Sequence, residues 1–228
     1  MKIAINVLNG MPEIFESIQG EGRNRGQKCI FIRLKGCNLH CSWCDTKDSW
    51  DNTDSLNEGV CFLSVPEIKR LFENYESKHV VITGGEPLLQ QEGLKELIEV
   101  LADYYIEVET NGTILPTIEV NQFNVSPKLG HSGNSRDIRE NPEVLKELAK
   151  KQNADFKFVV KTESDIARIC DFVRNYGIRK EKVFLMALGK TVKELQLREK
   201  MVEEFADMYG FSFTDRLHVK LYGNRRGV

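Results

Sequence analysis

Short apolar strand patterns alternate with amphipathic helix patterns along this sequence. Cys29–Leu34 is apolar and rich in β-branched residues, His79–Thr83 shares that character, and Tyr105–Gly112 indicates a strand that runs into a turn. Between them, apolar residues recur at helical spacing from Val65 and again from Leu94. This alternation predicts βα units that build a parallel sheet. The strands number about six or seven, fewer than the eight of a closed barrel. We therefore predict an α/β fold, a partial, open β/α barrel of about six parallel strands with outer helices.

The chain length suits one domain. The chain has 228 residues, of which 41% are hydrophobic and 29% are charged, an ordinary balance for a globular protein. No internal repeat or low-complexity linker divides it. We predict a single domain over residues 1–228, with an N-terminal extension (1–28), core βα units (29–190) and a C-terminal part (191–228). The C-terminal part should contain a helix, a strand and a tail.

Charge and hydropathy exclude several classes of partner. The net charge is −2, which gives no electrostatic attraction to nucleic acid. No apolar run approaches the roughly 20 residues that cross a bilayer. Met1–Val7 is too short and too polar for a secretory signal. The sequence predicts a cytoplasmic protein with no nucleic-acid or membrane partner, in a reducing compartment where thiolates survive.

Three of the six cysteines lie together, at Cys37, Cys41 and Cys44, in the pattern C-x3-C-x2-C. Three thiolates on one loop can converge on one metal centre. A structural zinc takes a fourth Cys or His, and a four-iron cluster normally takes four thiolates. The remaining cysteines are scattered, at Cys29, Cys61 and Cys170. A cluster with three protein ligands would leave one iron open for catalysis. The alternatives are chance burial, or a structural zinc with His40 or a distant residue as the fourth ligand.

The residues around these cysteines carry a family resemblance. Trp43 precedes the third cysteine, and T-G-G-E-P at residues 83–87 ends the next predicted strand. Together they resemble the radical S-adenosylmethionine (SAM) enzymes, whose core is a partial β/α barrel. The resemblance implies that Cys37, Cys41 and Cys44 hold a 4Fe-4S cluster. It also implies that SAM chelates the open iron and yields a 5′-deoxyadenosyl radical.

The same resemblance implies a set of contacts to SAM. In such enzymes G-G-E-P contacts the amino group of SAM, E-T-N-G follows on the next strand, and S-P-K lies near SAM. The expected SAM-binding residues are Trp43, Cys44, Asp45, Gly85, Glu86, Glu109, Ser126 and Lys128. From the residues alone, Glu109 could equally be a strand-end carboxylate in solvent, and Lys128 a solvated loop lysine.

Further motifs narrow the resemblance. Phe15–Gly22 matches F-x-S-[IL]-Q-G-E-G, and Cys44–Thr46 continues the cysteine loop as C-D-T. With the other motifs in the same order over nearly the whole chain, the sequence resembles the 7-carboxy-7-deazaguanine synthases. The resemblance implies a carbon–nitrogen lyase that converts 6-carboxy-5,6,7,8-tetrahydropterin to 7-carboxy-7-deazaguanine with loss of ammonia. This radical ring contraction belongs to queuosine and related deazapurine biosynthesis, with SAM acting catalytically.

The resemblance also implies a substrate site and a magnesium ion. Arg33 interrupts an apolar strand, where a cation is costly unless paired, and its planar fork suits a carboxylate. The resemblance assigns it to the substrate carboxylate; a structural ion pair is the alternative. Thr46 is implied as a ligand of Mg2+, and a helix N-cap or turn threonine is the alternative. The expected substrate-binding residues are Ile18, Gln19, Gly20, Glu21, Arg33 and Thr83.

The implied partners are the pterin substrate, an electron donor such as flavodoxin, and a second copy in a homodimer. Two alternatives stay open. One is a glycyl-radical-enzyme activase, with the same cofactors but a protein substrate; C-D-T, Q-G-E-G and Arg33 count against it. The other is a non-catalytic iron–sulfur or zinc-binding regulator, which the intact G-G-E-P disfavours.

The C-terminal part carries three further expectations. Residues 129–140 contain Gly and Ser and indicate a loop. Thr191 opens a capping box before an apolar pattern that ends at Gly210, which predicts one long helix. Residues 216–219 are predicted as a last short strand, with His218 as a strand-end histidine. Many synthases of the resembled family close with Q-x-H-K, which this chain lacks, so no substrate contact is carried over to these residues.

Overall fold

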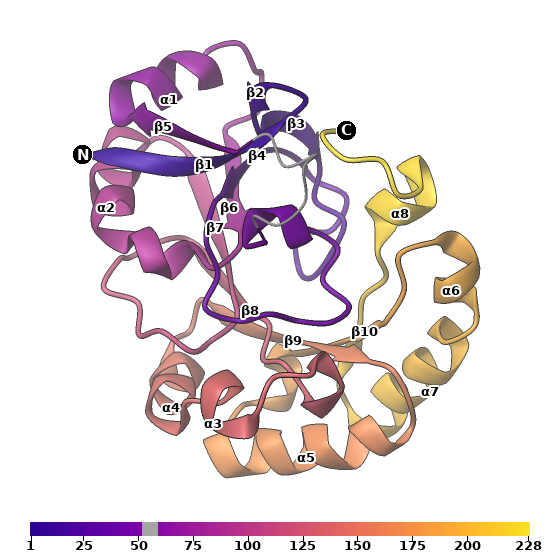
Figure 1. Ribbon diagram of the computed structural model, residues 1–228. Coiled ribbons are helices and arrows are strands. Elements are labelled where there is room, and N and C mark those ends of the chain that lie inside the picture. The colour runs from indigo at the N-terminus through magenta and orange to yellow at the C-terminus, as the bar shows by residue number, and fades with distance from the viewer. Residues whose placement is uncertain (52–58) are drawn as a thin grey trace.

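A curved, mostly parallel sheet forms the centre of the computed structural model, which describes residues 1–51 and 59–228. Its parallel strands, in the order in which they lie side by side, are β4 (Lys28–Leu34), β6 (His79–Gly84), β7 (Tyr105–Thr110), β8 (Gln122–Val125), β9 (Ala154–Val160), β10 (Val183–Ala187) and β11 (Ser212–Phe213). Figure 1 shows the sheet curving around a hollow without closing. The prediction of a partial, open β/α barrel is confirmed.

The N-terminal segment adds antiparallel strands to one side of this sheet. These strands are β1 (Lys2–Leu8), β2 (Met11–Pro12), β3 (Ile14–Ile18) and β5 (Val60–Ser64). Strand β3 pairs with β4 along its whole length, whereas β1 pairs with β2, β4 and β5. The pairing of β3 with β4 brings the predicted substrate-binding segment beside the strand that leads into the cysteine loop.

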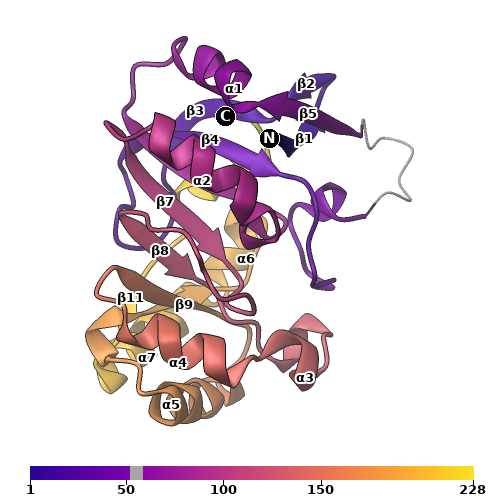
Figure 2. The ribbon, with the colours of Figure 1, turned by 90° about the vertical axis from the view of Figure 1, so that its left-hand side faces the viewer.

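Helices cover the outer face of the sheet, as Figure 2 shows for α1, α2, α4 and α5. The longer helices are α1 (Val65–Phe72), α2 (Gln91–Val100), α4 (Pro142–Lys150), α5 (Ser164–Tyr176) and α7 (Glu199–Tyr209). Each turns an apolar face to the strands; Leu94 and Leu97 of α2 are fully buried. Side-chain caps define where some of these helices begin. At the start of α4, the Asn141 side chain accepts a hydrogen bond from the Val144 N–H. None of the helices in the described residues is long and apolar enough to cross a membrane.

The predicted long helix after Thr191 is two helices. Helix α6 (Val192–Gln196) starts at the expected cap, where the Thr191 side chain accepts from the Glu194 N–H, and α7 ends at Gly210 in the left-handed conformation. Between them the Arg198 side chain donates to the Leu188 carbonyl, which lies just beyond β10. This contact to the end of the sheet holds the chain at Arg198 and separates the two helices.

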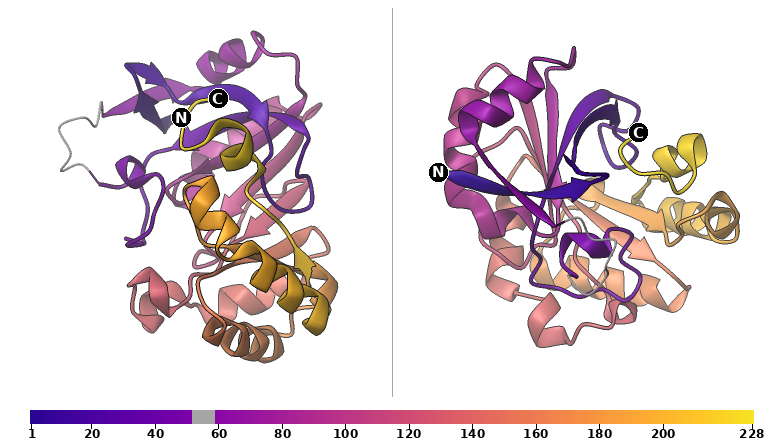
Figure 3. Two further views of the ribbon diagram at one scale, coloured as in Figure 1. Left: turned by 90° about the vertical axis from the view of Figure 1, so that its right-hand side faces the viewer. Right: turned by 45° about the horizontal axis from the view of Figure 1, so that its top comes forward.

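The predicted strand over residues 216–219 is wrong, because α8 (Leu217–Tyr222) occupies this segment. Its turns are closed by hydrogen bonds from the N–H groups of Val219 and Lys220 to the Arg216 carbonyl. Only Val219 of the apolar residues is buried there, while Leu221 is half exposed. Figure 3 shows α8 and the C-terminal segment lying across the open side of the sheet.

Candidate active site

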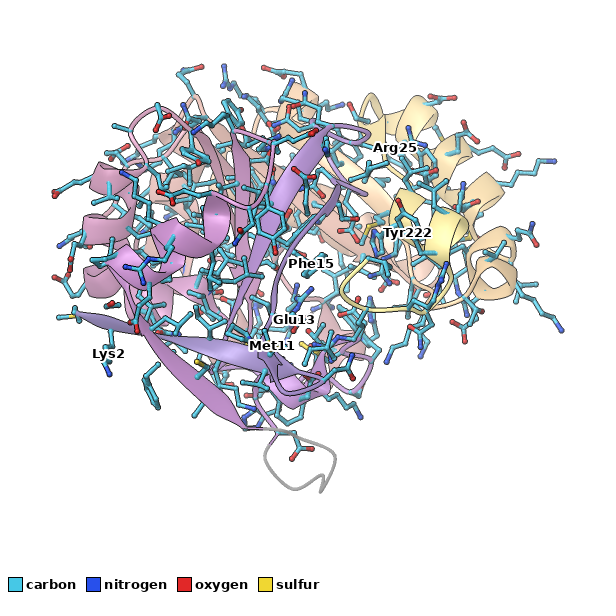
Figure 4. The ribbon with its side chains drawn as sticks, turned by 90° about the horizontal axis from the view of Figure 1, so that it is seen from above. Lys2, Met11, Glu13, Phe15, Arg25 and Tyr222 are labelled. Carbon is cyan, nitrogen blue, oxygen red and sulfur yellow. The ribbon has the colours of Figure 1, made fainter. Side chains whose placement is uncertain are left out.

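A cavity of about 300 Å³ lies in the hollow of the sheet, at the carboxyl ends of the parallel strands. Open β/α folds bind ligands at this end of their strands, and the volume reaches the range of small-molecule sites. All predicted site residues line it except Gly20 and Glu86. Figure 4 labels Glu13, which directly precedes β3, Phe15 of β3 and Tyr222 of α8, and all three residues line the same cavity.

The cysteine loop is tied to several segments distant in sequence. The Asn38 side chain accepts from Nδ2 of Asn111 at 2.9 Å and donates to Oγ1 of Thr113 at 2.8 Å. These two residues belong to the turn after β7, so the E-T-N-G motif supports the loop. On the opposite side, Nζ of Lys190 donates to the Cys44 carbonyl at 2.7 Å. The loop is therefore positioned by the tertiary structure rather than by its own sequence.

Residues 129–140 are more ordered than the predicted loop. They contain a 3-10 turn, η3 (Gly130–Ser132), and a short helix, α3 (Arg136–Arg139). The Ser42 N–H donates to the Ser132 carbonyl at 2.9 Å, and the His131 ring lies 5.6 Å from the Trp43 ring between centroids. This segment packs on the cysteine loop and forms one wall of the site.

The two glycines of T-G-G-E-P let two strand ends meet at backbone distance. Gly84 has a φ of +134°, and a Cβ at that position would lie 2.3 Å from the Leu34 carbonyl oxygen. A Cβ at Gly85 would lie 1.9 Å from the Gly36 carbonyl oxygen. The Gly85 N–H donates to the Leu34 carbonyl at 3.1 Å. Because no side chain stands between them, the turn after β6 lies directly against the start of the cysteine loop.

The three cysteine thiols line the cavity together. Within residues 1–51 and 59–228, no three His, Cys, Asp or Glu side chains converge on a position for a single metal ion. His40, the alternative zinc ligand, stacks instead on Trp50, with ring centroids 4.6 Å apart. A four-iron cluster is wider than one ion, so its thiolates stand further apart than the ligands of one ion. The donor set, three thiols around one cavity, fits a cluster with one iron open to a ligand.

Burial acts on these thiols. Burial raises the pKa of Cys37 to about 11 and also raises the pKa of Cys41. Both thiols are therefore protonated at neutral pH, and binding a metal centre would release their protons. Each also lies near a hydrogen-bond donor: the Leu39 N–H is 3.4 Å from Sγ of Cys37. Such donors stabilise negative charge on sulfur.

Three predicted SAM-binding residues, Trp43, Ser126 and Lys128, form one small cluster. Nζ of Lys128 donates to Oγ of Ser126 at 2.9 Å and lies 5.8 Å from the centre of the Trp43 ring. All three residues line the cavity. Lys128 is thus a partly buried cation on the wall of the site, not the solvated loop lysine that the residues alone allowed.

Glu86 lies behind the cavity wall. Its carboxylate is fully buried and accepts hydrogen bonds from the Leu88 N–H, the Asn111 N–H and the Thr110 hydroxyl at 2.7–3.1 Å. Burial raises its pKa, against these three donors. In this structure the side chain joins the turn after β6 to the end of β7, and its predicted contact with SAM stays a prediction.

Five side chains of alternating charge cross the cavity. Lys157 lies between Glu109 and Glu21, with Nζ 3.0 and 2.6 Å from their carboxylate oxygens. Arg216 continues the series, with Nε 3.0 Å from Glu21 and an Nη bonded to Asp45. Burial alone would raise the pKa of Glu21, but Lys157 and Arg216 outweigh it and hold that pKa well below its usual range. This series of ion pairs connects β7, β9, the N-terminal segment, the residue before α8 and the cysteine loop.

Sequence reasoning missed Lys157 and Arg216. A signal for Lys157 was present, since it is a lone cation in the otherwise apolar run Phe156–Val160, and the same signal identified Arg33. Glu109 and Glu21 were predicted, but as ligand contacts. The structure shows that both carboxylates form ion pairs. The alternative for Glu109, a strand-end carboxylate in solvent, is therefore wrong.

Arg33 is in an ion pair. Its Nε lies 2.9 Å from Oε1 of Glu13, whose side chain is 1% exposed, and Arg226 binds the other oxygen of Glu13 at 2.6 Å. The structural ion pair that the sequence allowed for Arg33 is therefore present in the protein. Among the described residues the pair uses Nε alone, so the terminal nitrogens of Arg33 are available to a ligand in the cavity that Arg33 lines.

Gly20 makes room for His218. A Cβ at Gly20 would lie 2.0 Å from Nδ1 of His218, and the Leu217 N–H donates to the Gly20 carbonyl at 3.0 Å. His218 lines the cavity from helix α8, so its interpretation as a strand-end histidine is wrong. The neighbouring Gln19 points inward, with Nε2 3.2 Å from Glu107.

Comparisons with known proteins agree with this site. Residues 31–201 match the model of the Radical SAM superfamily. The chain is 40% identical to a 7-carboxy-7-deazaguanine synthase of Pyrobaculum aerophilum, over 94% of this chain and 95% of that protein. It is 33% identical to a protein of the same name from Rhodopirellula baltica, over 95% of this chain and 87% of that protein.

Solved structures share the fold. The crystal structure of QueE from Escherichia coli matches with a TM-score of 0.74 and 25% identity, over 96% of this chain and 95% of that one. SuiB from Streptococcus suis, in a crystal structure with S-adenosylmethionine bound, matches with a TM-score of 0.52 and 15% identity, over 78% of this chain and 48% of that one. This second likeness concerns the fold alone.

The fold and the cysteine loop define a class: the chain belongs to the radical SAM superfamily. Members of that class use a 4Fe-4S cluster and SAM. Within it, the chain belongs to the 7-carboxy-7-deazaguanine synthases.

Proposed function

We propose that this protein catalyses the radical ring contraction of 6-carboxy-5,6,7,8-tetrahydropterin to 7-carboxy-7-deazaguanine, with release of ammonia. This is a carbon–nitrogen lyase reaction of queuosine and related deazapurine biosynthesis. One observation carries the proposal: the three thiols and the predicted substrate residues Gln19, Arg33 and Thr83 line one cavity. Family membership, at up to 40% identity across nearly the whole chain, supports it.

The cavity wall beside the cysteine loop would hold the cofactors. Cys37, Cys41 and Cys44 would bind the 4Fe-4S cluster and leave one iron facing the cavity. A cluster and SAM bound there would supply the radical chemistry that the reaction needs at C6 of the pterin. The protein's part is to orient the reactants and exclude water. The proposed SAM contacts are Trp43, Cys44, Asp45, the Gly85 backbone, Glu86, Glu109, Ser126 and Lys128.

The wall beside β3 and β4 would hold the pterin. Arg33 would pair its terminal nitrogens with the substrate carboxylate, while Glu13 fixes its Nε and so sets the direction of the fork. Ile18 and Thr83 would border the ring, and Gln19 would donate to its oxygens. Gly20 and Glu21 complete the proposed substrate-binding set, Gly20 through its backbone.

We also propose a magnesium ion at Thr46. Its hydroxyl lies in the cavity wall, and Mg2+ prefers oxygen ligands while keeping several waters. One protein oxygen would then suffice if substrate oxygens complete the shell. The ion would orient and polarise those oxygens.

We also propose a domain organisation, a cellular location, an oligomeric state and an electron donor for this enzyme. The enzyme would act as a single domain over residues 1–228, with residues 1–28 as its substrate-binding extension. It would work in the cytoplasm as a homodimer and would take its electron from a donor such as flavodoxin.

An anaerobic turnover assay tests the proposed function. The protein is reconstituted with iron and sulfide, then mixed with the tetrahydropterin, SAM, Mg2+ and a reductant, and the products are identified by mass spectrometry. We expect 7-carboxy-7-deazaguanine from the wild type and none from Cys41→Ala. Cleavage of SAM without a deazapurine would remove the substrate assignment and keep the radical SAM class.

Two other outcomes would favour the alternatives. A full cluster with intact SAM would support a non-catalytic regulator, and metal analysis that finds zinc and no sulfide would support a zinc protein. Capture of a glycyl-radical enzyme, followed by formation of its radical, would support an activase.

A further inference from the structure

The side chain of Asn134 lies against the cysteine loop from the segment after β8. Its Oδ1 accepts from the His40 N–H at 3.0 Å, and its Nδ2 lies 3.3 Å from Sγ of Cys41. Nδ2 also lies 3.3 Å from Oγ of Ser132. One amide thus contacts the backbone of the loop and one of its thiols.

The chemistry of the contacts fixes which end of the amide faces the sulfur. The His40 N–H can only donate, so the atom that receives it must be the carbonyl oxygen. The NH2 group therefore faces Cys41, and its two hydrogens match the two acceptors near it, Sγ of Cys41 and Oγ of Ser132. The backbone N–H of His40 therefore determines the orientation of the Asn134 amide, because the amide oxygen can accept this hydrogen bond and the amide nitrogen cannot.

Asn134 is held in place on its own side. Its N–H donates to Oγ of Ser132 at 3.3 Å, and its carbonyl accepts from Arg139 at 3.2 Å. Arg139 is 6% exposed and also donates to the Lys128 carbonyl at 2.9 Å. A buried arginine therefore braces the backbone that carries the amide, so the amide has little freedom to turn away.

The other two thiols take their nearest donors from their own loop. Cys37 receives the Leu39 N–H, and Sγ of Cys44 lies 3.7 Å from Oγ1 of Thr46. Among the described residues with a hydrogen-bond contact to these sulfurs, Asn134 alone comes from elsewhere in the chain, 93 residues after Cys41. It can therefore be changed without changing the sequence of the cysteine loop.

We propose that Asn134 is a positioning residue for the cluster: it anchors the cysteine loop through His40 and raises the cluster's reduction potential through its N–H···S contact with Cys41. Reduction adds negative charge that spreads onto the thiolates, and a hydrogen-bond donor stabilises that charge. Removing the donor should make the cluster harder to reduce. The inference rests on the proposed function only in requiring that the three cysteines hold a cluster.

Two variants separate anchoring from donation. Asn134→Ala removes both contacts, whereas Asn134→Asp keeps an oxygen for the His40 N–H and places a second oxygen toward the thiolate. Each full-length variant is reconstituted anaerobically, and its potential is measured by redox titration followed by electron paramagnetic resonance. We expect a lower potential in both, with the larger shift for Asn134→Asp. A tenfold weaker reduction equilibrium corresponds to about 59 mV for this one-electron step.

A matched control distinguishes tuning from general damage. Asn153 donates to the Val120 carbonyl at 2.7 Å, just before β9 and thus at the strand end away from the cavity. Asn153→Ala should lower thermal stability and leave the potential unchanged. Iron and sulfide content and the unfolding temperature are recorded for every variant.

The outcomes are distinct. Wild-type potentials in both Asn134 variants with full clusters would overturn the inference. Loss of the cluster from both, with wild-type unfolding temperatures, would overturn the anchoring part, because Asn134→Asp keeps an oxygen for the His40 N–H. Loss from Asn134→Ala together with retention and a lowered potential in Asn134→Asp would support both parts. A wild type that binds no cluster would instead remove the proposed function.

Discussion

Nζ of Lys157 lies 2.6 Å from Oε2 of Glu21, although 136 residues separate them in the chain. The side chain of Lys157 is buried, at 6% exposed, and that of Glu21 is mostly buried, at 14% exposed. Lys157 also binds Glu109, and Glu21 also binds Arg216. This pair therefore connects the N-terminal segment to the middle of the sheet, and it does so inside the cavity rather than on the surface.

Replacing Lys157 should destabilise the protein strongly. Lys157→Met would leave the carboxylates of Glu21 and Glu109 buried without their shared cation, which typically costs about 3–5 kcal/mol of unfolding free energy. Urea denaturation followed by circular dichroism measures this loss. The control is Lys95→Met, which breaks an exposed pair with Glu92 and should cost about 0–1 kcal/mol. Equal losses in the two variants would contradict the role given to Lys157.

A methyl group at Gly85 should disrupt the cluster site. In Gly85→Ala the new Cβ would meet the Gly36 carbonyl at 1.9 Å, and neither backbone can yield without moving the strand ends apart. We expect a loss of about 2–4 kcal/mol in stability and less iron per chain after reconstitution. Gly130→Ala is the control, because no atom lies within 4 Å of its Cβ position. Full iron loading of Gly85→Ala would show that the close approach is dispensable.

Gly20 and His218 should be coupled. Gly20→Ala places a Cβ 2.0 Å from Nδ1 of His218, so the ring must move and both stability and turnover should fall. In Gly20→Ala/His218→Ala the clash with the ring is absent, and we expect stability to recover by about 1–2 kcal/mol relative to the single variant. Unfolding curves of the two single variants and the double variant give this coupling energy. Purely additive losses would mean that Gly20 acts without His218.

Removing magnesium should slow turnover through Thr46. Chelation of Mg2+ should lower the wild-type rate about tenfold or more if the ion polarises substrate oxygens. Thr46→Val keeps the shape of the side chain and removes the hydroxyl, so its rate should be low and insensitive to added Mg2+. The readout is product formation against Mg2+ concentration at constant cluster content. A variant that responds to Mg2+ as the wild type does would exclude Thr46 as the ligand.

Stability should fall at high pH because of Tyr176. Burial, followed by its hydrogen bond to the Glu140 carboxylate, raises the pKa of Tyr176 to about 12, against about 10 in an unfolded chain. The folded state thus keeps a proton that the unfolded state loses. The stabilising contribution is complete below pH 10 and disappears as the pH rises toward 12. The wild type should therefore lose more unfolding free energy between pH 10 and 12 than Tyr176→Phe does; parallel curves would contradict this.

The motifs predicted the location of the site because they sit where parallel strands end. An open β/α fold brings those ends to one edge, so the order of the motifs predicts that Cys37, Thr83 and Ser126 lie around one site. The charge pairs could not be predicted in this way. The partner of Lys157 is 136 residues away, and only the folded chain brings the two together.

Helix α8 shows where local pattern was insufficient. Leu217, Val219 and Leu221 alternate with polar residues, which favours a strand. In the protein Arg216 donates to the Gly189 carbonyl at 2.7 Å and binds Glu21, and these distant contacts fix the start of a helix instead. A six-residue segment is too short for its own periodicity to outweigh such contacts.

The supports of the cysteine loop impose an order of events during biosynthesis. Lys190, which holds the Cys44 carbonyl, lies 146 residues further along the chain, and Asn134 lies 93 residues after Cys41. A nascent chain on the ribosome therefore exposes three cysteines long before the residues that position them exist. We therefore expect a cluster to be inserted stably only after the C-terminal strands are synthesised, and the thiols to be exposed to oxidation and to other metal ions until then.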